Sequence, residues 1–183
     1  IENGKIRPSK SLQDSIKKMI EGNQEFVMLD EQKVVYEEIL LQSMKCREDR
    51  KKRTIIIEGG PGTGKTVVAI NLLAKLTQEG QFVQYASKNS APRNVYVKKL
   101  SGQKKSRIQN MFKGSGSYVD VDSNIIDTVL CDEAHRLNEK SGLFNNLGEN
   151  QIKEIIHASR CSVFFIDESQ RVTLKDIGNI NEI

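Results

Sequence analysis

The sequence predicts an α/β fold in which a mainly parallel sheet is covered by helices on both faces. Segments typical of strands alternate with segments typical of helices along the 183 residues. The strand segments, such as III (55–57) and SVFFI (162–166), are continuous apolar runs, as expected for strands buried on both faces. Glycine-rich or acidic motifs directly follow three of the strands, and such sheets bind ligands beyond the carboxyl ends of their strands.

Two helices are expected before the first strand. The segment 11–21 has one apolar stripe, and Ser11 and Asp14 have the spacing of a capping box. The segment 30–46 has a second stripe, with Asp30 as its N-cap. These helices form an N-terminal segment, 1–52, that packs on a core formed by 53–183.

The core itself is expected to alternate strands and helices. Pro92 suits the first turn of a helix that ends near Leu100, and the glycines and serines of 113–117 suggest a flexible connection. After Gln170 we expect one short, partly helical segment. The expected strands are 54–58, 82–86, 127–131 and 161–166, and the further helices are 67–76, 149–159 and, with the weakest pattern, 103–113.

Composition excludes some classes of protein. Hydrophobic residues make up 37% and charged residues 28%, and no apolar run approaches the ~20 residues of a membrane span. The polar first ten residues do not resemble a secretory leader, and the initial Ile suggests a segment of a longer protein. Three cysteines without metal-like spacing favour a reducing, cytoplasmic location. The net charge of +4 permits nucleic-acid binding without requiring it.

The stretch GGPGTGKT after the first strand predicts a phosphate-binding loop. Gly59, Gly64, Lys65 and Thr66 satisfy the pattern G-x-x-x-x-G-K-[ST]. Glycines let successive amide groups point into one hollow, and the helix that follows adds its own amides and its dipole. Lys65 supplies a mobile positive charge for catalysis, and the Thr66 hydroxyl can bind Mg²⁺. The predicted nucleotide-binding residues are Gly60, Pro61, Gly62, Thr63, Gly64, Lys65 and Thr66.

Two adjacent acids end the 127–131 strand. Asp132 suits a ligand for Mg²⁺, and Glu133 suits a catalytic base that orients and deprotonates a water molecule, which favours hydrolysis over transfer to a hydroxyl. Acids at a strand end can also serve only as helix caps. His135 suits either coupling to bound phosphate or a plain surface position.

A third polar motif, DESQ, follows the 161–166 strand. The amide of Gln170 can hydrogen-bond a terminal phosphate and respond to its loss, so Gln170 is the candidate sensor. An ordinary polar loop is the alternative.

Together these residues resemble the first RecA-like motor domain of superfamily 1 helicases, and more closely the Schlafen-like DNA/RNA helicase domain family. The likeness covers most of the chain and lies in RPSKSL (7–12), FVMLDEQKVVYEEIL (26–40), GGPGTGKTVVAINLL (59–73), the DEAH strand and FFIDESQRV (164–172). It implies a three-layer P-loop ATPase core acting on DNA or RNA, with Mg²⁺ and ATP.

The resemblance also assigns roles. It implies that Gln32 reads adenine, that residues 84–100 touch the nucleic-acid backbone, and that the DESQ strand lies between the other two motif strands. With four strands, the GGPGTGKT strand would then lie at an edge. A second RecA-like domain with an arginine finger is expected in cis beyond Ile183.

Two other functions stay open at this stage. A ring-forming ATPase of the chaperone or loader type shares the loop and the acid pair. A nucleotide-gated binding module without turnover would share the loop alone. The basic cluster after the second strand can neutralise nucleic-acid phosphates or simply face solvent; it comprises Lys98, Lys99, Lys104, Lys105 and Arg107. RKKR (50–53) is expected to be a solvated face.

Overall fold

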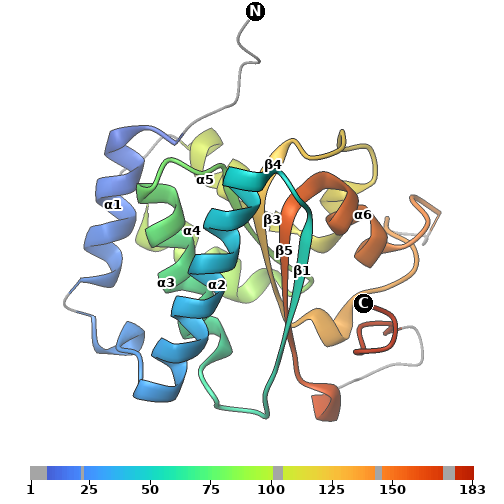
Figure 1. The fold of residues 1–183 in the computed structure, drawn as a ribbon, viewed down its shortest axis with the longest axis horizontal. Helices are drawn as coiled ribbons and strands as arrows, with labels where there is room; N and C mark the ends of the chain where they lie inside the picture. Colours follow the sequence, from blue (N-terminus) through green and yellow to red (C-terminus); the bar gives the residue numbers. More distant parts are fainter. Residues whose placement is uncertain (1–7, 22, 101–104, 143–145, 171–175) are drawn as a thin grey trace, which may run out of the picture.

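The computed structural model describes residues 8–21, 23–100, 105–142, 146–170 and 176–183, and it has a three-layer α/β fold (Figure 1). Its central sheet has five strands, all parallel, in the order β1-β5-β4-β2-β3. The strands are β1 (Arg53–Glu58), β2 (Val83–Ser87), β3 (Phe112–Gly114), β4 (Ile126–Asp132) and β5 (Ser159–Ile166). The predicted position of β5 between β1 and β4 is confirmed, and β1 lies at an edge of the described sheet.

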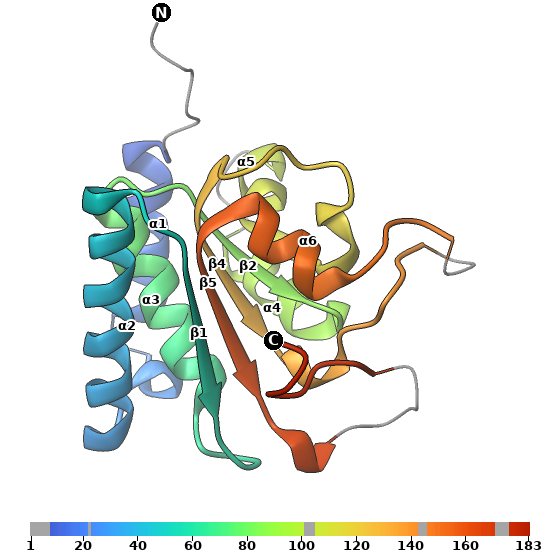
Figure 2. The same ribbon diagram turned by 45° about the vertical axis from the view of Figure 1, so that its right-hand side comes forward.

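Helices cover both faces of this sheet. Figure 2 shows α1, α2 and α3 stacked against one face and α6 against the other. The α-helices are α1 (Lys10–Ile20), α2 (Asp30–Asp49), α3 (Lys65–Gln78), α4 (Ser90–Lys99), α5 (Lys105–Met111) and α6 (Gln151–Ala158). Short 3₁₀ turns are η1 (Gln24–Phe26), η2 (Ser115–Tyr118), η3 (Ala134–Arg136) and η4 (Glu168–Gln170). No helix of the described ranges is long and apolar enough to span a membrane.

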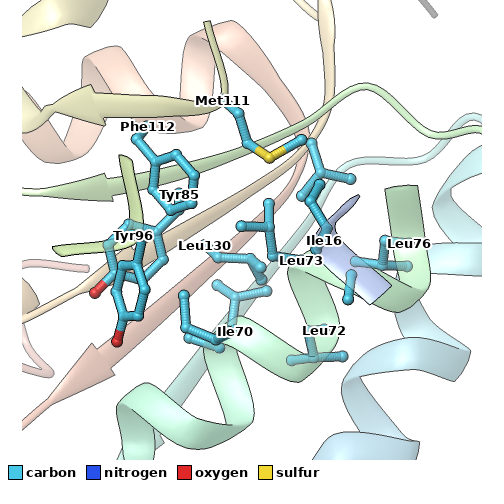
Figure 3. Close-up of a cluster of buried hydrophobic side chains, with 14 of the residues drawn as sticks. Ile16, Ile70, Leu72, Leu73, Leu76, Tyr85, Tyr96, Met111, Phe112 and Leu130 are labelled. Carbon is cyan, nitrogen blue, oxygen red and sulfur yellow. The ribbon is translucent and has the colours of Figure 1, made fainter. Parts of the chain in front are cut away.

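The strands are apolar throughout because each face of the sheet has its own core. In β5, Val163 and Phe165 belong to the cluster under α1–α3, while Phe164 and Ile166 belong to the cluster under α6. All four side chains are fully buried. Figure 3 shows the first cluster, where the rings of Tyr85, Tyr96 and Phe112 meet beside the leucines of α3.

The region expected to be a flexible connection is ordered instead. Phe112–Gly114 forms β3, which pairs with β2, and η2 follows it directly. The reason is apolar burial: the side chains of Phe112 and Tyr118 are 5% and 2% exposed, and Ser115 is also buried. The prediction of 113–117 as a flexible connection, and with it the count of four strands, is therefore wrong.

The helix starts also differ from prediction. Helix α1 begins at Lys10 with Ser9 at the cap position, so Ser11 lies inside the first turn and the predicted capping box does not form. In α2 the N-cap is Leu29, and Asp30 is the first helical residue, where the helix dipole still favours its carboxylate. After Gln170, residues 171–175 and thus most of the predicted segment lie outside the described residues, and 176–183 forms turns and bends rather than a helix.

A buried polar cluster ties α2 to the sheet. The hydroxyls of Ser43 and Thr128 are 2.6 Å apart, and both lie within 3.0 Å of the Gln81 side-chain oxygen. All three residues are at most 1% exposed. Buried polar groups stabilise only when paired, so each of these depends on the others.

We expect Thr128→Val to destabilise the fold by ~1–3 kcal/mol, because it leaves polar partners buried without their hydroxyl. The free energy of unfolding in urea measures the loss. Thr54→Val, at an exposed position of β1, is the matched control and should change stability little. Equal stability of the two variants would contradict this role of the cluster.

Candidate functional site

A glycine loop (Gly59–Thr66) joins β1 to α3 and forms the base of the site. Gly62 and Gly64 have φ angles of 74° and 82°, in the left-handed region that glycine adopts most easily. At Gly64 a side chain would also overlap the amide nitrogen of Gln32. Thr63 closes the turn by donating its hydroxyl to the Gly60 carbonyl at 2.9 Å. The loop is thus bent back on itself, with α3 starting directly behind it.

Lys65 points back into the loop. Its ammonium group donates to the carbonyl oxygens of Gly59 and, at 2.7 Å, Gly60. The Asp167 carboxylate lies 3.7 Å away, and the side chains of this pair are 14% and 3% exposed. The ammonium group of Lys65 is therefore held within the loop, beside the carboxylate of Asp167.

Asp132, at the end of β4, connects the loop to the centre of the sheet. Its Oδ2 atom accepts hydrogen bonds from the hydroxyls of Thr66 at 2.7 Å and Tyr85 at 2.6 Å. Burial, and next the negative charge of Asp132, raise the pKa of Tyr85 well above its ordinary value, so Tyr85 stays a donor. The carboxylate is thus held in one orientation from two sides.

Glu133 follows in a left-handed conformation, with φ 53° and ψ 40°. For a residue with a side chain this is an unfavourable backbone state, which persists only where the surroundings hold it. Its own N–H donates to Asp132 at 2.9 Å, and the Ser87 hydroxyl donates to Glu133 Oε2 at 3.2 Å. The Glu133 carboxylate thus lies beside Ser87, at the end of β2.

His135 is buried, at 2% exposure, so the alternative of a surface position is wrong. Its Nδ1 atom accepts a hydrogen bond from the backbone N–H of Asp167 at 3.2 Å, which places the proton of the neutral ring on Nε2. Burial lowers the pKa of His135. The imidazole therefore links the turn after β4 to the end of β5.

Asp167 faces the loop from the end of β5. The Ser169 hydroxyl donates to Oδ1 at 2.6 Å and, as the largest cause, holds the pKa of Asp167 below its usual value; Lys65 adds to this. Within the described part of the chain, Oδ2 is buried without a hydrogen-bond partner, apart from the nearby charge of Lys65. The loop thus faces a buried, ionised carboxylate.

Gln32 lies in the first turn of α2, against the loop. Its side-chain nitrogen donates to the Thr63 carbonyl and its oxygen accepts from the Leu29 N–H, both at 2.9 Å. The residue lines a cavity of about 340 Å³, together with apolar groups such as Val35 and Phe165. This mainly apolar hollow beside the glycine loop has the size and lining of a small-molecule site.

The structure brings most of the predicted site residues together and leaves one outside. Lys65, Thr66, Asp132 and Glu133 converge through the contacts given above. Gln170 ends η4, where its backbone N–H donates to the Asp167 carbonyl at 3.0 Å while its side chain is exposed to solvent.

The sequence placed Tyr85 and Ser87 only in the segment 84–100, which the resemblance assigns to nucleic-acid contact, and gave them no part beside Asp132 and Glu133. Both lie on β2, which pairs with β4, and Ser87 is the register partner of Asp132. In the sequence, their only sign of a role in the site is that they carry hydroxyl groups near the carboxyl end of a buried strand. That signal gains meaning only once β2 is known to neighbour β4.

Some of the basic residues already have partners within the chain, and others face solvent. Lys99 is 2.6 Å from a Glu25 carboxylate oxygen and lies over the Phe26 ring. Lys52 donates to the carbonyls at the end of α6, among them that of His157 at 2.9 Å. Lys98 is exposed. The predicted positions Lys104, Lys105 and Arg107 lie outside the part of the chain whose side chains are described.

Comparison with known proteins decides the family. Residues 52–183 match the model of the family described as Schlafen group 3, DNA/RNA helicase domain. The chain belongs to this family. The matched range contains the whole central sheet, the glycine loop and both acidic motifs.

The comparisons with curated proteins and with solved structures do not extend this family assignment. No curated protein matches this Schlafen group 3 domain. Among solved structures, it is similar to the C-terminal domain of a possible DNA helicase from Lactobacillus plantarum WCFS1. That alignment covers 96% of this chain and 95% of the other, at 11% identity and a TM-score of 0.41.

The contact between Gly64 and Gln32 gives a double-mutant prediction. Gly64→Ala should destabilise the domain, through strain at positive φ and through overlap with the Gln32 amide. In a Gln32→Ala background the second cause is absent, so the same substitution should be less destabilising by about 1 kcal/mol. Chemical denaturation of the four proteins measures the coupling. Strictly additive losses would show that the amide does not limit this position.

Proposed function

We propose that this Schlafen group 3 domain is the ATP-binding and ATP-hydrolysing half of a nucleic-acid motor. The observation that carries the proposal is the hydrogen bond between Thr66 and Asp132, which sets the anion-binding loop against the acidic motif of β4. The helicase-type family supports nucleic acid as the partner.

The glycine loop would hold the phosphates of ATP. The backbone N–H groups of Gly60 and of residues 62–66, together with the N-terminus of α3, would donate to these phosphates and favour their negative charge. Lys65 would exchange the carbonyls of Gly59 and Gly60 for the β- and γ-phosphate oxygens. Adenine would occupy the cavity beside Gln32, and the Gln32 amide would bind it after releasing the Thr63 carbonyl.

Thr66 and Asp132 fit a site for Mg²⁺. A hydroxyl and a carboxylate are oxygen ligands, the kind this ion prefers, and the two already lie within 2.7 Å of one another. When bound, Mg²⁺ would neutralise charge on the phosphates. The chain contributes by presenting both oxygens on separate, rigid elements, with Tyr85 holding the carboxylate in place.

Glu133 would act as the general base. It would orient a water molecule and accept its proton as the water oxygen bonds to the γ-phosphorus and the bond to the ADP oxygen breaks. Lys65 and the loop amides would stabilise the charge that develops. Ser87 would keep the Glu133 carboxylate in position. Gln170 would meet the γ-phosphate as a sensor after movement of η4.

Nucleic acid, DNA or RNA, would bind along the exposed part of the segment 84–100, from Lys88 onward, because residues 84–87 are buried in β2. A second RecA-like domain in cis would supply an arginine finger, which contributes about a thousandfold or more to rate in related reactions. The chain alone should therefore bind Mg-ATP, hydrolyse it slowly and leave duplexes intact. Processive unwinding by the 183 residues alone would contradict this division of labour.

We expect Glu133→Gln to lower the rate of ATP hydrolysis by about 10²–10⁴-fold, because it removes the proton acceptor. Nucleotide affinity should stay within about twofold of the parent, since the loop is untouched. Phosphate release and calorimetry with Mg-ATP give the two values. Glu139→Gln, at an exposed position, is the control.

The same assay separates the other functions. If single-stranded DNA or RNA raises the rate of ATP hydrolysis, the motor is favoured. If the rate is the same with and without nucleic acid, an ATPase of the chaperone or loader type is favoured. Binding without turnover in any condition favours a nucleotide-gated module. Unchanged hydrolysis in Glu133→Gln would remove Glu133 from the reaction.

A further inference from the structure

The segment 176–183 packs against the turn η3 that follows Glu133. Its backbone forms an antiparallel bridge between Asp176 and Asn138, and the Ile177 N–H donates to the Leu137 carbonyl at 2.7 Å. Figure 2 shows the C-terminus lying beside the ends of the central strands. A segment distant in sequence thus forms part of the wall of the acidic motif.

Gly178 makes the closest approach. A methyl group at this position would overlap the carbonyl oxygen of Ala134 and crowd the Cα atom of His135. The φ angle of Gly178 lies outside the left-handed region, so its lack of a side chain serves this approach rather than an unusual backbone shape. The backbone of Gly178 therefore rests directly on η3.

An ion pair between half-buried Lys88 and buried Asp176 connects the same segment to the end of β2. The Lys88 ammonium lies 3.2 Å from Asp176 and 3.0 Å from the Asn138 side-chain oxygen. Asp176 is 1% exposed, and Lys88 is adjacent in sequence to Ser87, the residue that donates to Glu133. Two neighbouring residues at the end of β2 thus contact the two sides of the acidic turn: Ser87 contacts Glu133, and Lys88 contacts Asp176.

Glu133 needs such support. It is the N-cap of η3, and its left-handed backbone is held only if the turn behind it cannot relax. The hydrogen bonds that define the turn run from Arg136 to Glu133 and from Leu137 to Ala134, at 3.0 and 3.1 Å. Leu137 and Ala134, the residues that 176–183 contacts, carry the second of these bonds.

We propose that residues 176–178 and Lys88 form a brace that positions Glu133 for attack by water, with Gly178 as its positioning residue. The inference rests on the proposed hydrolysis, in which Glu133 is the base. None of the contacts described above for Lys88 and residues 176–178 reaches the glycine loop or Gln32, so we expect the brace to act on the chemical step and not on nucleotide binding. Displacement of a catalytic group by about 1 Å can lower a rate by about 10²-fold.

The test compares Gly178→Ala with Gly80→Ala. Gly80 has φ 75° with nothing within 4 Å of an added methyl group, so alanine there introduces backbone strain away from the site. In single-turnover hydrolysis with excess protein, Gly178→Ala should lose about 10²-fold in rate with an unchanged Kd for Mg-ATP, while Gly80→Ala keeps the parent rate. Asp176→Asn, a milder change, should show a smaller loss in the same direction.

Amide hydrogen exchange supplies a readout that does not depend on activity. In Gly178→Ala the amides of Arg136 and Leu137 should exchange about tenfold faster or more, because the turn opens locally. Unchanged exchange, a rate within twofold of Gly80→Ala, or a Kd that rises in step with the rate loss would overturn the brace. If the parent itself shows no hydrolysis, the proposed function fails, and exchange at η3 still decides whether the brace exists.

Discussion

The hydrogen bond between the Thr66 hydroxyl and the Asp132 carboxylate is the contact on which the rest of the site depends. The strands that carry the two motifs are not neighbours, because β5 lies between β1 and β4. Thr66 reaches Asp132 only because the glycine loop turns back and starts α3 above the sheet. This one bond therefore reports that the loop, the helix and the strand order are all in place.

The residues around this bond fix the positions of the charged groups of the site through hydrogen bonds and an ion pair. Tyr85 fixes Asp132 from β2, and the buried carboxylate of Asp167 faces Lys65 from β5. The imidazole of His135 connects the ends of β4 and β5. These groups are placed by three strands of a close-packed sheet, β2, β4 and β5, so the site gains a rigidity that a loop alone lacks. The bent backbone at Glu133 is held by the same packing.

Much of this arrangement could be predicted from the sequence, because periodicity and motif order are local signals. Continuous apolar strands predicted the two-sided parallel sheet, and the three motifs predicted one active edge. Three features could not be predicted from such local signals. They are the burial of His135, the hydrogen-bond donors on β2, and the ordered structure of residues 112–118. They depend on which strands are neighbours and on two aromatic side chains, Phe112 and Tyr118, that outweigh a glycine- and serine-rich composition. Gly178 was missed for the same reason, since its neighbour is 44 residues away in sequence.

The central claim is that the glycine loop binds a triphosphate through Lys65 and the amides around it. Titration calorimetry with Mg-ATP tests this most directly, on the parent, on Lys65→Ala and on Lys75→Ala. Lys75 lies on the same helix and pairs only with Glu79 among the described ion pairs, so it controls for the loss of one charge. The account predicts saturable heat for the parent and for Lys75→Ala, and its loss in Lys65→Ala. No heat from the parent, or equal heat from all three proteins, would contradict it.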